Sequence, residues 1–209
     1  MNYSNVGIKS GNVLYISSKT KEKGFDVESP YDGKTYYHKE LDSIKGKLSA
    51  KKLEGGKFGE RIKLFLNQDE NNSLVLEVPT IMDDSLLPWA AELAKFLPNI
   101  NIGDEIEIST NTSKKDKDGR PYKNLYITAN GQSVPWAFKL EDVPKPEQKK
   151  SKLKGDVTWD FSARDEFLYD IIKKSLQAAA KEAQEAHTPE GYKSSKKNKP
   201  VESKSDLPF

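Results

Sequence analysis

The stretch that decides the fold is IKGKLSAK at residues 44–51, where apolar or small residues alternate with lysine and serine. Two similar stretches follow, RIKLFLN at 61–67 and LVLEV at 74–78. A period of two places alternate side chains on opposite faces, so each stretch predicts a half-buried β-strand. The residues between them, EGG at 54–56 and NN at 71–72, predict turns.

The period of the apolar residues changes after the third stretch. From 86 to 97, leucine and alanine recur at helical spacing, which predicts a helix that Asp84 or Ser85 caps. Alternation then returns at 105–109 and at 122–128, which predicts a fourth and a fifth strand.

This order, three strands, a helix and two strands, lacks the strict alternation of βαβ units. Over residues 45–130 it resembles the OB-fold, and Gly103-Asp104 supplies a matching turn before the fourth strand. We therefore predict a mainly β protein. Its OB-fold domain, a five-stranded Greek-key barrel with one helix between strands 3 and 4, is expected at residues 35–142.

The rest of the chain is expected to flank this domain. Residues 1–34 are interpreted as an N-terminal extension, and 143–159 as a linker rich in lysine and proline. Residues 160–186 predict a helix, and 187–209 a flexible tail. The apolar first half of the helix packs either on the barrel or on a second copy, so monomer and dimer both stay open.

Composition narrows the function. The chain has 209 residues, 35% of them hydrophobic and 32% charged, with a net charge of +2, no cysteine and two histidines. No apolar run reaches the roughly 20 residues of a spanning helix, and disulfides and thiolate zinc sites are excluded. Without a nucleotide-binding or catalytic motif, we expect neither an enzyme nor a metal or cofactor site. The N-terminus lacks a secretory pattern, which favours the cytoplasm, of a host cell if the protein is viral.

The last four residues, Asp206-Leu207-Pro208-Phe209, resemble the C-terminal tips of single-stranded DNA-binding proteins of bacteria and T7-like phages. The resemblance implies a protein of phage or viral type that coats single strands in DNA replication, recombination and repair. It also implies that these four residues bind partner proteins such as a polymerase, helicase, primase or recombinase. The tail departs from the family pattern because it is not strongly acidic.

Binding a single strand requires cations for the phosphates and flat rings for the bases. OB-folds bind through strands 2 and 3 and the loops between strands 1–2 and 4–5, and these regions contain both kinds of side chain. The candidate DNA-binding residues are Lys45, Lys47, Lys51, Lys57, Phe58, Arg61, Lys63, Phe65, Lys114, Lys115, Lys117, Arg120, Tyr122, Tyr126 and Trp136.

Two other functions remain open at this stage. One is an OB-like adaptor that binds proteins in a replisome or a virion, and the other is an RNA-binding protein of cold-shock type. Residues 35–130 contain 14 basic and 15 acidic side chains. Any attraction to nucleic acid must therefore depend on where the lysines lie.

Overall fold

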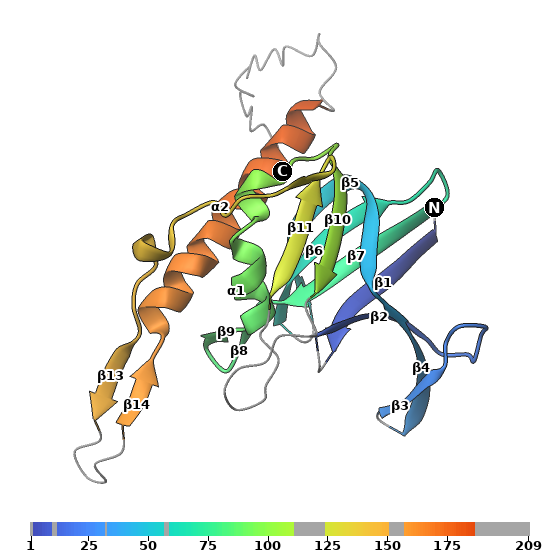
Figure 1. Ribbon diagram of the computed structural model, residues 1–209, viewed down its shortest axis with the longest axis horizontal. Coiled ribbons are helices and arrows are strands. Elements are labelled where there is room, and N and C mark those ends of the chain that lie inside the picture. Colours follow the sequence, from blue (N-terminus) through green and yellow to red (C-terminus); the bar gives the residue numbers. More distant parts are fainter. Residues whose placement is uncertain are drawn as a thin grey trace, which may run out of the picture.

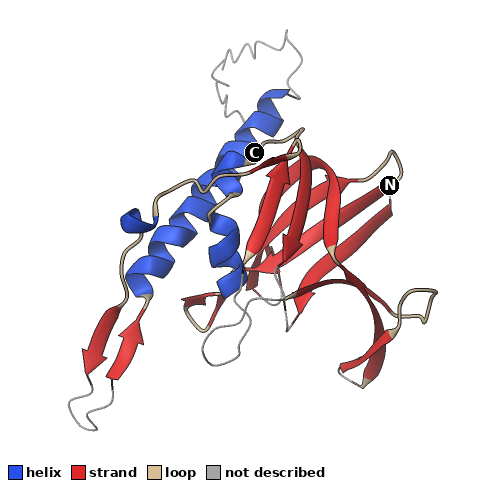
Figure 2. Cartoon of the chain, in the orientation of Figure 1, coloured by secondary structure: helices blue, strands red, loops and turns tan. Residues whose placement is uncertain are grey.

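The computed structural model describes residues 2–9, 12–31, 33–56, 59–110, 124–150 and 157–186. The protein is mainly β, and most of its strands belong to one large mixed sheet (Figures 1 and 2). The order in this ten-stranded sheet is β12-β11-β10-β5-β6-β7-β1-β2-β4-β3. Its strands are β1 (Asn2–Lys9), β2 (Val13–Ser18), β3 (Val27–Tyr31), β4 (Lys34–Leu41), β5 (Ser43–Gly56), β6 (Gly59–Asn67), β7 (Asn72–Pro79), β10 (Glu105–Thr110), β11 (Leu125–Ala129) and β12 (Gln132–Ser133).

The five strands predicted from alternation are confirmed as β5, β6, β7, β10 and β11, with helix α1 (Pro88–Ala94) between the third and the fourth. They lie side by side in the order β11-β10-β5-β6-β7, and each neighbouring pair is antiparallel. Within the described residues β7 does not pair with β11, so these five strands do not close on themselves. The free edge of β7 pairs instead with β1, in parallel.

The N-terminal residues are therefore part of the sheet rather than an extension beside it. β1 continues into β2, β4 and β3, and β4 crosses the predicted boundary between residues 34 and 35, so that boundary is wrong. Val6 and Leu14, one on each of the first two strands, are fully buried. The strand edge of β7 explains the pairing, since its backbone N–H and C=O groups require partners when they lie inside a domain.

Helix α1 lies against the core on one side of the sheet. It starts at Pro88, which occupies the first turn, and buries Ala90, Leu93 and Ala94. The predicted caps are wrong, because Ser85 belongs to a short hairpin of β8 (Ile81–Met82) and β9 (Ser85–Leu86). The helix also ends earlier than predicted, and a 3-10 turn, η1 (Leu97–Asn99), follows it.

The predicted C-terminal helix is confirmed as α2 (Ser162–Ala186), which packs on this chain's own sheet and on α1 (Figure 1). Leu168, Ile172, Leu176 and Ala179 recur every three or four residues and are buried. Helix α2 thus lies next to α1 and covers β5.

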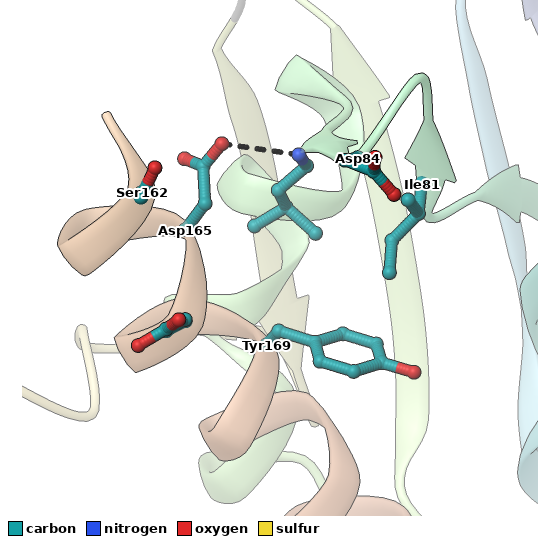
Figure 3. Close-up of a pocket in the computed structure, with 7 residues that line it drawn as sticks. Ile81, Asp84, Ser162, Asp165 and Tyr169 are labelled. Carbon is teal, nitrogen blue, oxygen red and sulfur yellow. Dashed lines mark hydrogen bonds between the residues drawn. The ribbon is translucent and has the colours of Figure 1, made fainter. Parts of the chain in front are cut away.

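The start of α2 is joined to the β8–β9 hairpin by polar contacts around a small cavity of about 190 Å³ (Figure 3). The Asp165 carboxylate accepts a hydrogen bond from the Leu86 backbone N–H at 3.1 Å, drawn as the dashed line in Figure 3. Nearby, the Tyr169 hydroxyl contacts the Glu60 carboxylate. Burial and this carboxylate raise the pKa of Tyr169 to about 12. The cavity lies between the β8–β9 hairpin and the start of α2, where these contacts hold the helix in place.

The predicted linker contains structure of its own. It forms most of an antiparallel hairpin of β13 (Glu147–Lys150) and β14 (Val157–Asp160), and a 3-10 turn, η2 (Leu140–Asp142), lies just before it. Figure 1 shows this hairpin extending beyond the start of α2, away from the large sheet. None of the described helices is long and apolar enough to cross a membrane.

Candidate nucleic-acid interface

The candidate interface lies on the face of β5, β6, β7 and β1 that is turned away from the core, which we call the outer face. The strand registers place residues on it in pairs, with Lys52 opposite Lys63 and Glu54 opposite Arg61. Directly paired residues of neighbouring strands project to the same side of a sheet. Alternate positions on β6, such as Ile62, Leu64 and Leu66, project to the other side and are fully buried.

Two of the predicted cations lie together on the outer face, but both are paired with carboxylates. Lys63 Nζ lies 2.7 Å from Glu54 Oε2 and 3.2 Å from Glu77 Oε1, and Arg61 Nη1 lies 3.1 Å from Glu77 Oε2. The hydrogen bond to Glu54 raises the pKa of Lys63, and the hydrogen bond to Lys63 lowers the pKa of Glu54. A phosphate that binds here has to replace a carboxylate.

Lys45 and Lys47 are exposed at the other end of β5 and make no ion pair with any described residue. Across the sheet they lie opposite Glu107 and Glu105 of β10. Glu107 already accepts a hydrogen bond from Ser43 Oγ at 3.0 Å. These two lysines are therefore the predicted cations best placed to meet a phosphate without first breaking an ion pair.

Lys51 was predicted on the same face, and this prediction is wrong. The register between β5 and β6 shifts between Leu48 and Ala50, which marks a β-bulge at Ser49. One extra residue reverses the side on which every later side chain lies. Lys51 is consequently buried, and its ammonium donates to the carbonyl oxygens of Leu97 and Ile100, both at 2.8 Å. This lysine holds η1 against the sheet.

An aromatic pair with a lysine lies on the outer face, close to the end of β6 and the start of β1. Phe65 packs edge to face against Tyr3 of β1, with ring centroids 6.3 Å apart. Lys52 Nζ lies 5.3 Å from the centroid of the Phe65 ring. Tyr3 is 59% exposed. The cluster of Tyr3, Phe65 and Lys52 thus combines one exposed ring and one partly buried ring with a cation, and rings with cations are what single-strand binding requires.

A groove of about 470 Å³ opens beside this cluster, between β1, β2, β4, β6 and β7. Its lining includes Asn5, Tyr15 and Tyr36, together with Arg61 and Glu77 of the ion-pair network. The first two strands were not expected to join this surface, and Asn5, Tyr15 and Tyr36 are absent from the predicted set. Alternation in YSNVGIK, residues 3–9, is the signal that indicates a strand there.

The position of the Tyr15 ring depends on Gly7. A Cβ on Gly7 would lie 2.9 Å from the Tyr15 ring atoms, so only a glycine lets the ring lie over β1. The other side of Tyr15 is stacked near His38, with ring centroids 4.5 Å apart and planes inclined by 35°. Burial, followed by the charge of Lys9, lowers the pKa of His38.

The two remaining described candidates lie elsewhere. Tyr126 on β11 is half exposed and lies across from Ser109 of β10, and β10, β5, β6 and β7 separate it from Tyr3 on β1. Trp136 follows β12 and lies beside α1, where Lys95 Nζ is 4.6 Å from its ring centroid. The backbone N–H of Ala137 donates to the Lys95 carbonyl at 2.7 Å. Trp136 is therefore not part of the outer face of β5, β6, β7 and β1.

The other predicted residues lie outside the described part of the chain. Two belong to the connection between β5 and β6, five to the connection between β10 and β11, and four to the tail. They are Lys57, Phe58, Lys114, Lys115, Lys117, Arg120, Tyr122, Asp206, Leu207, Pro208 and Phe209.

Among the residues that the structure describes, no three histidine, cysteine, aspartate or glutamate side chains come together as a metal site. Comparison of the chain with protein-family models, with curated proteins and with solved structures finds no match.

Proposed function

We propose that this chain is a single-stranded DNA-binding protein that holds the strand across the outer face of β5, β6, β7 and β1. The observation that carries the proposal is the cluster of exposed Tyr3, partly buried Phe65 and exposed Lys52, which lies near a groove. Rings stack on bases without regard to sequence, each stack contributing about 1–3 kcal/mol, and nearby cations bind the phosphates. In this proposal Lys45 and Lys47 extend the phosphate path along β5.

The strand order supports an OB-type scaffold for this activity. Numbered along the chain as 1 to 5, strands β5, β6, β7, β10 and β11 lie in the order 5-4-1-2-3, with α1 between strands 3 and 4. OB-folds bind nucleic acid on strands 2 and 3. Here these are β6 and β7, which contribute Phe65 and Glu77. The parallel strand β1 widens the same face in place of barrel closure.

The test is the binding of labelled oligo-dT, and of a duplex of the same length, across a salt series. We expect oligo-dT to bind more tightly than the duplex, with an affinity that falls as salt rises. Failure to bind oligo-dT at low salt contradicts the proposal. A competing oligo-U separates DNA from RNA preference, and salt-insensitive DNA binding together with a tight protein complex favours the adaptor function instead.

Variants locate the interaction. Phe65→Ala should weaken oligo-dT binding by about five- to 150-fold, the loss of one stack of about 1–3 kcal/mol. Lys52→Ala should weaken it less and lower the salt dependence. Lys139→Ala is the matched control, because Lys139 is highly exposed and pairs with Glu141 away from the sheet. Equal losses in Lys52→Ala and Lys139→Ala would contradict a site on the outer face.

Recruitment of replication, recombination or repair proteins through Asp206-Leu207-Pro208-Phe209 belongs to the same proposal. A terminal aromatic ring fills an apolar pocket of the partner, and a basic residue there pairs with the carboxylate. Removal of Phe209 should abolish capture of a partner while leaving the affinity for oligo-dT nearly unchanged. Loss of both activities together would contradict the separation of the two functions.

A further inference from the structure

The hairpin of β13 and β14 presents an unexpected row of apolar side chains to solvent. Val157, Trp159 and Phe161 are 53%, 55% and 40% exposed. They occupy alternate positions in an extended stretch, so they lie on one side of it, about 6.5 Å from one to the next. We call these three residues the hairpin stripe. Exposed apolar groups gathered in this way are typical of an interaction surface.

The stripe is anchored to the folded body rather than hanging from a free linker. Asp160, between Trp159 and Phe161, pairs with Lys149 across the hairpin. The same carboxylate accepts hydrogen bonds from the Ser162 backbone N–H at 2.9 Å and from Ser162 Oγ at 2.6 Å, at the start of α2. These bonds lower the pKa of Asp160, the one to Lys149 most strongly. One ionised carboxylate thus ties both strands to the helix.

The charge around the stripe favours an anionic partner. Strand β13 contributes Lys149 and Lys150 against one glutamate, Glu147, and Lys149 pairs with Asp160. At the helix end of the stripe, the Arg164 guanidinium lies 4.6 Å from the centroid of the Phe161 ring. Two flat rings two residues apart, with a cation over one of them, are the kind of side chains on which successive bases of a single strand stack.

We propose that the hairpin stripe is a second contact for single-stranded DNA, in which Trp159 and Phe161 stack on bases. This inference rests on the proposed function and adds a site outside the outer face. Because the hairpin extends away from the large sheet (Figure 1), only a strand long enough to leave the outer face reaches it. A single OB fold covers about 4–16 nucleotides, so short and long oligonucleotides distinguish the two contacts.

The experiment uses the full chain with oligo-dT of about 10 and about 30 nucleotides, the first within and the second well above the 4–16 or so that one OB fold covers. We expect Trp159→Ala to weaken binding of the long oligonucleotide by about five- to 150-fold, the loss of one base stack, and to leave the short one unchanged. Trp159→Phe should retain most of the affinity while reducing the quenching of tryptophan fluorescence. Trp159→Leu, which keeps apolar area but no flat ring, should behave like alanine.

Leu140→Ala is the control, because Leu140 is 72% exposed on η2 and does not belong to the stripe. An unchanged affinity of Trp159→Ala for the long oligonucleotide overturns the inference. So does full affinity in Trp159→Leu, which would indicate apolar packing against a protein rather than stacking. If the wild-type protein binds neither oligonucleotide, the proposed function itself fails. If it binds both and Trp159→Ala matches it, only the second contact fails.

Discussion

Glu77→Gln tests most directly whether the ion pairs of the outer face limit phosphate binding. Glu77 is a half-buried residue on β7, and its two oxygens pair with different cations, Arg61 at 3.1 Å and Lys63 at 3.2 Å. The amide keeps the shape of the side chain and its hydrogen-bonding oxygen but removes the charge. One cation of the outer face is then free to meet a phosphate, so we expect Glu77→Gln to bind single-stranded DNA more tightly than the wild type.

The size of the gain follows from counterion release. Each additional phosphate contact to a single strand adds about 0.7 to the slope of log affinity against log salt. Relative to 1 M salt, one contact therefore multiplies the affinity by about 5 at 0.1 M and by about 3 at 0.2 M. The variant should show a moderate gain at low salt that shrinks steadily as salt rises, together with a slope steeper by about 0.7.

The assay is the fluorescence anisotropy of labelled oligo-dT, measured for wild type and variant over the same salt series. Glu141→Gln is the matched control, because it removes one negative charge from an exposed pair with Lys139 and changes the net charge equally. We expect little change in the control. Equal gains in both variants would mean that only total charge matters. An unchanged affinity and slope in Glu77→Gln would refute phosphate binding beside Arg61 and Lys63.

Three further changes test the fold and its pH dependence. Lys51→Met should lower the free energy of unfolding in urea by about 1–3 kcal/mol, because two buried carbonyls lose their donor. Its affinity for DNA should stay unchanged, and a loss of affinity in the folded variant would indicate that Lys51 contacts DNA. Gly46→Ala should lower the thermal midpoint, since a Cβ there would lie 2.7 Å from the Asn67 carbonyl oxygen; an unchanged midpoint would show that β5 and β6 move apart at little cost. The lowered pKa of His38 means that the unfolded chain binds the proton more readily. Stability should therefore fall as the pH drops below about 6.5, and His38→Gln should flatten this part of the pH profile; an equally steep profile in the variant would assign the loss to other groups.

The strands of the central sheet were predictable because local alternation determines them. In β6, in β7 and in β5 up to the bulge, every second residue is apolar or small, and only a few residues separate neighbouring strands along the chain. The bulge at Ser49 was not predictable in the same way. Its neighbours Ala50 and Lys51 continue the alternation by residue type, yet the extra residue turns Lys51 inward to the carbonyls of η1. A period of two cannot reveal where its phase changes.

The pairing of β1 with β7 was beyond the reach of sequence reasoning for a different reason. The two strands are parallel and more than sixty residues apart, so no short turn connects them and predicts their pairing. This pairing brings Tyr3 to Phe65 and places Tyr15 over Gly7. The candidate site therefore combines Phe65, which the sequence indicates, with Tyr3 and Lys52, which only the tertiary structure brings to it.

The outer face has as many carboxylates as cations in its ion-pair network. Arg61 and Lys63 are held by Glu54 and Glu77, so a phosphate that binds there exchanges one anionic partner for another. Such an exchange contributes less free energy than the neutralisation of a free cation. Stacking on exposed rings involves no comparable exchange. If DNA binds as proposed, most of the affinity should therefore come from Tyr3 and Phe65, and the paired cations should mainly fix the path of the backbone.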